Sequence, residues 1–405
     1  MNIGRMLRMC TGCLFFIAAA ARADSPVASV RIGFDRDGIT SVQAEGFADK
    51  AAARRITAND PVRVASISKL VTMLGVMRLV EAGKLDLDAD VSRYLGWKLR
   101  NPAFPNAPIT LRMLVSHRSS LTDAAGYWQT PLDCRLRDTL DNPRAWDSEH
   151  APGTYFRYTN LNFPVVAQVA ERITGERFDR LMQRLVLAPL GIDGCFGWDT
   201  CGEATAARAA VQYDTDGKPI MDDNRGRKPS CPVRPARNGG CDLLHYRPGE
   251  NGALFGPQGG LRISAVDLAR IGMLLLGDGT LALNGVHLLK PASVQAMATP
   301  LWEYDGRNGL TYEEDSADHQ PGFFCRWGMG MQILATHGEN CRDDPFGDRV
   351  ARIGHSGTAY GLQAGMWLDR ERGTGVIWFA TGMPEERVGG RSAFSVLEEK
   401  LAREQ

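Results

Sequence analysis

The sequence has no excess of charge of either sign. Its 405 residues include 47 lysines and arginines and 47 aspartates and glutamates, so the formal net charge is zero. No long basic run interrupts this balance. A chain without a basic region lacks the attraction for phosphate groups that nucleic-acid and anionic-membrane binding requires. Neither is therefore expected as a partner.

Long hydrophobic runs are also missing. The apolar stretch Cys13–Ala20 is much shorter than the roughly 20 residues that a membrane-spanning helix needs. Arg5 and Arg8 precede it, and Ala21-Arg22-Ala23 follows it, which is the pattern of a signal peptide ending at residue 23. A lipoprotein anchor at Cys13 is the weaker alternative, because the residues before this cysteine lack the usual aliphatic side chain. The sequence therefore predicts a periplasmic or secreted protein with no stable membrane span after signal cleavage.

No C-x-x-C spacing occurs, which argues against a zinc site as the reason for the cysteines. His245 is the only histidine close to the cysteines between 195 and 241. In an oxidising compartment, cysteines that are near in sequence are expected to pair. We therefore predict no metal and local disulfides, with zinc and other pairings as the alternatives: Cys195 with Cys201, Cys231 with Cys241, and Cys325 with Cys341. Cys134 would then be left unpaired.

The stretch 61–82 combines a serine, a lysine and a helical pattern. After Ser66, apolar residues recur with a helical period, at Leu70, Met73, Leu74, Met77 and Val80. This spacing predicts an amphipathic helix with Ser66 at its N-terminus, where unpaired N–H groups favour negative charge. Lys69 would lie one turn away on the same face. These are the parts of a covalent serine hydrolase; the alternative is a capping serine beside a solvated lysine.

Strand patterns lie near both ends of the chain, and helical patterns lie between them. Apolar runs at 28–34 and 39–46 are joined by a turn signal at 35–38, and further runs occupy 361–368 and 375–380. This order predicts an α+β fold: an antiparallel sheet from both termini, flanked by helices, with an inserted mostly α-helical domain. A site is expected in the cleft between the two parts.

Three short motifs follow one another along the chain: Ser66-x-x-Lys69, Tyr158-x-Asn160 and His355-Ser356-Gly357-Thr358. In this order they resemble the penicillin-recognising serine hydrolases. The branch that they resemble most contains class C β-lactamases, D-alanyl-D-alanine carboxypeptidases, D-aminopeptidases and related esterases. The resemblance covers about residues 28–190 and 252–401. It implies a β-lactamase/transpeptidase-like fold and an enzyme without cofactor.

The expected organisation is a signal peptide followed by one hydrolase domain made of a sheet part and a mostly helical part. The boundaries are 1–23 for the signal peptide, 24–401 for the domain, about 24–62 and 322–405 for the sheet part, and about 63–321 for the helical part. Residues 195–250 are rich in glycine, proline, arginine and cysteine and show neither strand nor helix period. They are expected to form a disulfide-stapled excursion.

The resemblance implies a catalytic role for three side chains. Ser66 would be the nucleophile that forms the acyl-enzyme. Lys69 would have to be desolvated so that its neutral form can accept a proton. Tyr158 would relay the proton to the leaving group, provided that neighbouring donors or cations lower its pKa. The plainer alternative for Tyr158 is a buried aromatic residue with a satisfied hydroxyl group.

The resemblance also implies a set of substrate-binding residues. Asn160 would hold the catalytic lysine and a substrate amide, although it could also be an ordinary cap before the following helix. His355, Ser356, Gly357 and Thr358 would bind substrate along an edge strand. The backbone N–H group of Thr358, together with that of the nucleophile, would form the oxyanion hole.

His355 stands where many members of this branch have lysine. Histidine holds a substrate carboxylate only when it is protonated, which argues against efficient β-lactam hydrolysis. The sequence therefore predicts an exported serine hydrolase that acts through a Ser66 acyl-enzyme on amide or ester bonds. D-amino-acid peptides are the expected substrates. The alternatives are a β-lactamase or carboxylesterase of the same family, or a penicillin-binding sensor with little turnover; the oligomeric state stays open.

Overall fold

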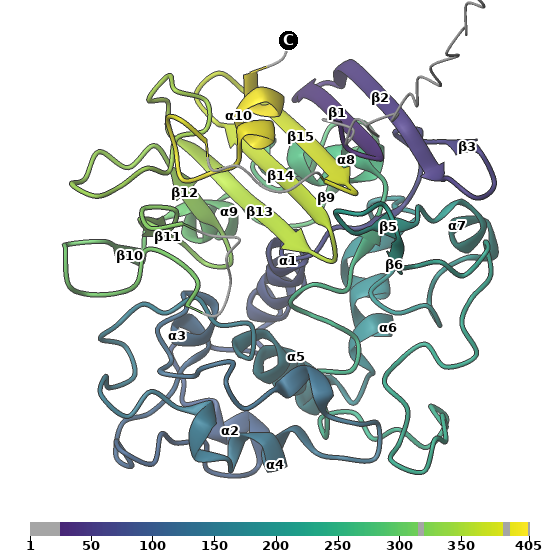
Figure 1. The fold of residues 1–405 in the computed structure, drawn as a ribbon. Coiled ribbons are helices and arrows are strands. Elements are labelled where there is room, and N and C mark those ends of the chain that lie inside the picture. Colours follow the sequence, from purple (N-terminus) through teal and green to yellow (C-terminus); the bar gives the residue numbers. More distant parts are fainter. Residues whose placement is uncertain (1–24, 315–319, 384–388, 404–405) are drawn as a thin grey trace, which may run out of the picture.

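The computed structural model describes residues 25–314, 320–383 and 389–403, and its largest element is a nine-stranded sheet (Figure 1). The strand order is β10-β11-β12-β13-β14-β15-β1-β2-β3. The N-terminal strands are β1 (Ala28–Asp35), β2 (Ile39–Asp49) and β3 (Arg54–Arg55). The other six are β10 (Trp302–Glu303), β11 (Arg326–Trp327), β12 (Gln332–Leu334), β13 (Arg352–Ala359), β14 (Leu362–Asp369) and β15 (Thr374–Thr381). Antiparallel pairing of β1 with β15 joins the two ends of the chain, which confirms the predicted fold class.

Helices cover both faces of this sheet. In Figure 1, α10 (Val396–Arg403) lies in front of β14 and β15, and α8 (Ala265–Leu276) lies behind them. Gly272 allows α8 to approach closely, because a Cβ atom there would lie 2.3 Å from the ring of Phe34. Ser264 caps α8 by accepting a hydrogen bond from the Asp267 N–H group. The sheet core is therefore closed on both sides.

The remaining elements form the mostly helical part below the sheet in Figure 1. Its helices are α2 (Ser92–Leu95), α3 (Leu111–Val115), α4 (Leu136–Leu140), α5 (Asn162–Thr174), α6 (Phe178–Met182) and α7 (Glu203–Arg208), with α9 (Pro291–Ala298) nearer the sheet. Short turns of helix are η1 (Tyr127–Gln129), η2 (Pro143–Ala145) and η3 (Gln183–Leu187). Three two-stranded pairs complete the structure: β4 (Val62–Arg63) with β7 (Arg262–Ile263), β5 (Gln212–Tyr213) with β6 (Pro219–Met221), and β8 (Thr280–Leu281) with β9 (Val286–His287). The β8–β9 pair lies behind the sheet, against α8 (Figure 1).

Helix α1 (Ile67–Glu81) occupies the middle of the molecule, between the sheet and the helical part (Figure 1). Every residue from Ile67 to Met77 is buried. The expectation of an amphipathic helix is therefore wrong, because α1 packs against neighbours on all sides. Its contact with α6 is close: a Cβ atom at Gly75 would lie 2.6 Å from the sulfur of Met182. A central helix of this kind gives its N-terminal residues a rigid support.

The three predicted disulfides are present in the structure, and among the described cysteines Cys134 alone is unpaired. The excursion at 195–250 differs from the prediction, since it contains α7 and the β5–β6 pair. The N–H group of Tyr213 donates to Thr381 Oγ1 at 2.9 Å, which ties this segment to the end of β15. The sequence pattern missed these elements because each is only two to six residues long.

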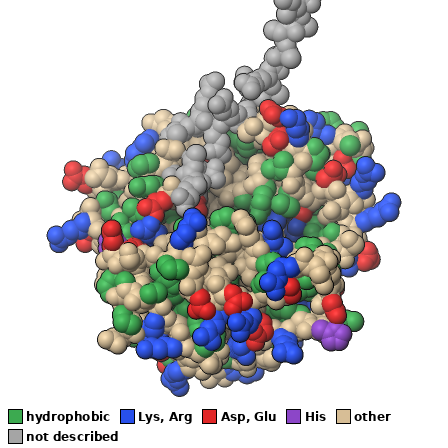
Figure 2. All heavy atoms as spheres, turned by 60° about the horizontal axis from the view of Figure 1, so that its bottom comes forward, with side chains coloured by type: hydrophobic (Ala, Val, Ile, Leu, Met, Phe, Trp, Pro, Cys, Tyr) green, Lys and Arg blue, Asp and Glu red, His purple; other side chains and the backbone are tan. Residues whose placement is uncertain are grey.

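The predicted signal peptide lies outside the described residues. Within the described ranges, no helix has the length and apolar character needed to cross a membrane. On the face shown in Figure 2, acidic and basic side chains are interspersed with apolar ones, and neither sign forms a continuous patch there. This distribution matches the balanced composition of the sequence.

Candidate active site

Ser66 is the N-cap residue of α1, as the sequence predicts. Strand β4 leads to it, and Ala65 takes the left-handed φ of 46°, which turns the chain sharply before the helix. The Ser68 hydroxyl donates to the Ala65 carbonyl at 2.6 Å and stabilises this turn. Ser66 is partly exposed although most of its neighbours are buried. The turn therefore presents the Ser66 hydroxyl at a helix N-terminus, where the helix dipole is positive.

Lys69 is completely buried directly behind this serine. Its Nζ lies 2.9 Å from Ser66 Oγ, and it also donates to Asn160 Oδ1 at 2.7 Å and to the Gln258 carbonyl at 3.1 Å. Burial lowers the pKa of Lys69 to about 7, and the negative charges of Glu313 and Asp123 oppose that effect. A large fraction of this amine is therefore neutral near pH 7. A neutral amine in contact with a hydroxyl group can accept its proton.

The ring of Tyr158 lies against the Lys69 amine, with its centre 4.8 Å from Nζ. Its ring stacks between those of His117 and Phe324, at centroid distances of 4.5 and 4.7 Å. Burial and the charge of Glu313 raise the pKa of Tyr158 well above its usual value, although a hydrogen bond with the Ser66 side chain opposes this. The expected lowering of this pKa is therefore wrong, because desolvation outweighs the nearby donors. At neutral pH the phenol is protonated, in hydrogen-bond contact with the nucleophile.

Asp123 is a residue of this site that the sequence interpretation missed. Its carboxylate accepts hydrogen bonds from the Asn160 N–H group at 2.9 Å, from Asn160 Nδ2 at 3.0 Å and from the Leu161 N–H group at 2.8 Å. These bonds turn the Asn160 amide so that Oδ1 faces Lys69. Burial raises the pKa of Asp123 to about 6. No motif surrounds Asp123 in the sequence, so no local signal could have identified it.

Glu313 is the second residue that was missed. It lies on the loop between β10 and β11, and its Oε1 is 3.4 Å from Asn160 Nδ2. Its negative charge raises the pKa values of Lys69, Asp123 and Tyr158. The amide of Asn160 therefore stands between one lysine and two carboxylates. Only the folding of a distant loop reveals this arrangement.

Strand β13 passes directly beside the serine turn. A Cβ atom at Gly357 would lie 2.4 Å from the Val64 carbonyl oxygen and 3.4 Å from Ile67 Cγ1, so only glycine fits there. The register of β13 with β12 ends at Gly354, whereas its pairing with β14 continues to Ala359. Thr358 is partly exposed on this stretch. The end of β13 near Ser66 therefore offers a free strand edge.

The two histidines near the site are both buried. His355 Nδ1 lies 2.5 Å from the Ser356 carbonyl oxygen, and its ring packs edge-on against Trp327 at 5.2 Å. The role of His355 and Ser356 in binding substrate therefore stays a prediction. His117 Nδ1 accepts a hydrogen bond from the Thr159 N–H group at 3.0 Å, and burial holds the pKa of His117 well below its usual value. His117 thus has a structural, hydrogen-bonding position.

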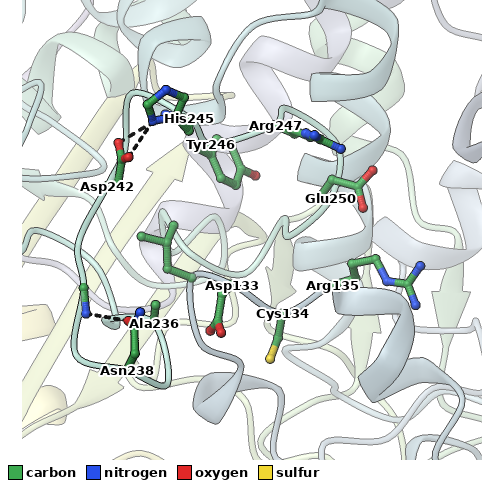
Figure 3. Close-up of a pocket in the computed structure, with 12 residues that line it drawn as sticks. Asp133, Cys134, Arg135, Ala236, Asn238, Asp242, His245, Tyr246, Arg247 and Glu250 are labelled. Atoms are coloured by element: carbon green, nitrogen blue, oxygen red, sulfur yellow. Dashed lines mark hydrogen bonds and ion pairs between the residues drawn. The ribbon is translucent and has the colours of Figure 1, made fainter.

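A pocket of about 250 Å³ adjoins the site and contains Gln258 in its wall. A larger pocket of about 610 Å³ lies elsewhere, between the loop around Cys134 and the excursion (Figure 3). In Figure 3, Cys134 and His245 lie on opposite sides of this pocket. His245 pairs with Asp242 and makes no contact with Cys134 there. The larger pocket contains none of the side chains that surround the serine, so it is separate from the serine site.

Comparison with known proteins gives these positions a context. Residues 18–398 match the family model described as Beta-lactamase. Esterase EstB of Burkholderia gladioli is 33% identical over 195 residues, 44% of this chain and 47% of the esterase. Penicillin-binding protein 4 of Amycolatopsis lactamdurans is 25% identical over 286 residues, 69% of this chain and 67% of that protein. The match with the esterase thus spans less than half of that relative.

Solved structures show the same fold. The octameric penicillin-binding protein homologue from Pyrococcus abyssi superposes with a TM-score of 0.63 at 19% identity, covering 89% of this chain and 71% of that one. A D-stereospecific amidohydrolase from Streptomyces sp. gives 0.59 at 18% identity and covers 95% of both chains. The family model accounts for nearly all of the chain, and the serine and lysine of the first motif meet the tyrosine of the second in one place. The chain belongs to the Beta-lactamase family.

Proposed function

We propose that this protein is a serine hydrolase that cleaves amide or ester bonds through an acyl-enzyme on Ser66, without a cofactor. The observation that carries the proposal is the buried Lys69, whose Nζ lies 2.9 Å from Ser66 Oγ and whose pKa is lowered to about 7. A lysine that was merely solvated on the surface of a helix would remain exposed and charged. A neutral amine within hydrogen-bond reach of a hydroxyl group meets the requirement for a general base.

Acylation then follows from the positions of three side chains. The Ser66 hydroxyl proton passes to the neutral amine of Lys69 while Oγ bonds to the substrate carbonyl carbon. The backbone N–H groups of Ser66 and Thr358 stabilise the oxyanion. As the carbonyl–leaving group bond breaks, the protonated phenol of Tyr158 gives its proton to the leaving group and regains one from the Lys69 ammonium group.

Deacylation uses the same groups with water in place of the leaving group. Water attacks the acyl carbon as its proton passes through Tyr158 to Lys69, and Ser66 Oγ leaves with a proton returned from Lys69. Asp123 positions Asn160, and Asn160 positions the lysine amine. His355 packs on this cluster and would bind a substrate carboxylate only after protonation and a change of side-chain contacts.

D-amino-acid peptides are the substrates that we propose for this site. The support is the similarity of the fold to a structure described as a D-stereospecific amidohydrolase, together with the histidine at position 355. A carboxylesterase is the second candidate, because Esterase EstB is 33% identical over the part of the chain that it matches. A β-lactamase and a penicillin-binding sensor with little turnover remain the alternatives.

We also propose that the protein is exported, with residues 1–23 removed as a signal peptide. The three disulfides support an oxidising compartment, and the periplasm or the extracellular space provides one. N-terminal sequencing of the protein purified from its native host tests this proposal. A first residue of Asp24 is expected, and an intact Met1 in a cytoplasmic fraction would contradict it.

One set of assays tests the enzymatic proposal. Wild type and Ser66→Ala are compared on D-alanyl peptides, on D-amino-acid amides, on 4-nitrophenyl esters and on a chromogenic cephalosporin. We expect turnover of amides or esters by wild type and none by Ser66→Ala, with a mass increase of one acyl group on the peptide that contains Ser66. Permanent labelling by a fluorescent penicillin without turnover of any substrate would favour the sensor instead.

A further inference from the structure

The pocket of about 250 Å³ beside the site has a floor formed by Phe196 and the segment 253–262, and further walls from four other parts of the chain. Arg63 comes from β4, Tyr127 and Trp128 come from η1, and Tyr360 follows β13. The fourth wall is Pro232, Val233 and Arg234 of the excursion. Trp128 and Tyr360 are exposed large rings, at 57% and 42% of their possible surface. Half of the sixteen residues that line the pocket are aromatic residues or arginines.

This pocket opens next to the reacting serine. Gln258 lines it and accepts a hydrogen bond from Lys69 Nζ at 3.1 Å through its carbonyl oxygen. Arg63 precedes Ser66 by three residues, and Tyr360 follows Thr358 by two. In the mechanism proposed above, the leaving group departs on the Tyr158 side. The acyl part of the substrate, which stays bonded to Ser66, must then extend away from Tyr158, and this pocket provides the space.

Two of the three arginines that line the pocket have no carboxylate partner among the described residues. Arg63 donates through Nε to the Gly259 carbonyl at 3.0 Å, and its guanidinium carbon lies 4.6 Å above the ring of Tyr360. Arg234 is exposed. Arg262, in contrast, is paired with Asp222 at 2.6 Å. None of the described residues that line this pocket is acidic, and the active-site carboxylates Asp123 and Glu313 are both held at Asn160.

The excursion is fixed where it forms the wall. The disulfide Cys231–Cys241 begins directly before Pro232, so the backbone of the wall is constrained on the side of the pocket. A constrained backbone reduces the ordering that ligand binding requires. The excursion thus carries an arginine to the mouth of a preformed aromatic pocket.

We propose that this pocket is a specificity site for acyl groups that combine a flat apolar body with a carboxylate, with Arg63 and Arg234 binding the carboxylate and Tyr127, Trp128 and Tyr360 contacting the body. Guanidinium groups pair with carboxylates through planar, charge-assisted hydrogen bonds. Aromatic walls favour a flat apolar group between them. This inference rests on the proposed serine hydrolase function.

The test compares two esters that differ only in charge: mono(4-nitrophenyl) terephthalate and its methyl ester. The rigid ring keeps the carboxylate away from the ester, so the free acid cannot catalyse its own hydrolysis. For wild type we expect kcat/KM to favour the charged ester by about tenfold, which is the size of one good charge-assisted contact. High salt should reduce the preference, because Arg234 is exposed.

Substitutions of the two arginines test whether these residues produce the preference for the charged ester. Arg63→Gln should lower the charged-to-neutral ratio of kcat/KM at least fivefold, and Arg234→Gln about two- to threefold because exposed pairs contribute less. Arg63→Lys should restore part of the ratio. Arg227→Gln is the matched control, because Arg227 is an exposed arginine of the same excursion and does not line the pocket. It should keep the wild-type ratio. The ratio cancels any general loss of activity, and Arg234→Gln serves if Arg63→Gln does not fold.

The outcomes separate this inference from the function on which it rests. If wild type hydrolyses both esters equally, or if Arg63→Gln and Arg234→Gln keep the wild-type ratio, the specificity site is wrong and the hydrolase remains. If Ser66→Ala hydrolyses the esters as fast as wild type, the proposed function is wrong and this inference falls with it. If wild type accepts neither ester but turns over neutral acyl substrates, the hydrolase again stands and the specificity site is wrong.

Discussion

Replacing Glu313 by glutamine should move the acid limb of the kcat/KM profile to lower pH. The carboxylate of Glu313 favours the charged form of Lys69, because a negative charge stabilises a nearby ammonium group. Removing that charge favours the neutral amine and lowers the pKa of Lys69 below about 7. The acid limb of kcat/KM reports the protonation of the base in the free enzyme, so activity should persist at lower pH.

The magnitude follows from two distances in the structure. Asn160 lies between the groups, with Oδ1 at 2.7 Å from Lys69 Nζ and Nδ2 at 3.4 Å from Glu313 Oε1. The two charges are therefore at most about 8 Å apart, which gives about 0.5 kcal/mol in a water-like dielectric and about 2 kcal/mol at an effective dielectric of about 20. Since about 1.4 kcal/mol corresponds to one pH unit, the limb should move by about 0.4 to 1.5 pH units.

The assay is the initial rate of ester hydrolysis at low substrate concentration, measured from about pH 5 to pH 9. Glu314→Gln is the matched control, because the neighbouring carboxylate pairs with Arg157 instead of Asn160. It should leave the midpoint unchanged. Asp123, with a pKa of about 6, would respond to Glu313→Gln in the same direction. The movement should therefore be repeated in an Asp123→Asn background, where only Lys69 remains to produce it.

Three results would refute the reasoning. A midpoint that stays in place or rises in Glu313→Gln means that this carboxylate does not act on the base. An equal movement in Glu314→Gln means that the effect is a general one of lost negative charge at the surface. A profile without any acid limb near pH 7 would show that Lys69 is not the titrating base.

Three further predictions address separate parts of the site and the fold. Tyr158→Phe should lower kcat by about 10²- to 10⁴-fold and make an acyl-enzyme accumulate in mass spectra, because the proton relay to the leaving group and from water is lost; turnover at the wild-type rate would exclude that relay. Gly357→Ala should destabilise the protein by about 1–3 kcal/mol and reduce activity, since its Cβ would lie 2.4 Å from the Val64 carbonyl oxygen; an unchanged melting temperature in calorimetry would contradict this packing. Ser264→Ala should cost about 1 kcal/mol through loss of the α8 cap and leave kcat/KM unchanged, measured by urea unfolding beside the ester assay.

The two titratable groups beside Ser66 have complementary protonation states at neutral pH. Burial makes Lys69 a weaker base with a pKa of about 7 and keeps Tyr158 protonated. One group can therefore accept the serine proton while the other already carries a proton to donate. The sequence interpretation assumed an ionisable tyrosine instead, because it counted neighbouring donors and could not include the desolvation of a fully enclosed phenol.

Local features of this protein are determined by the sequence alone. The Ser66-x-x-Lys69 spacing places both groups on one turn of helix, the Ser264 cap begins α8, and the cysteine pairs are separated by at most 16 residues. Each of these depends on residues within a few turns of one another, so the pattern suffices. The strand runs at both ends also predicted the sheet.

Only the tertiary structure decided which distant groups meet at the serine. Asn160 is 91 residues from Lys69, and Glu313 is 153 residues from Asn160, yet a single amide joins all three. Asp123, Glu313 and the arginine of the excursion carry no motif. The all-round burial of α1 depends on its packing against β13 and β14 on one side and α6 and η3 on the other. Their positions result from packing between remote segments, which also sets the dielectric and hence the pKa values, and no local pattern encodes it.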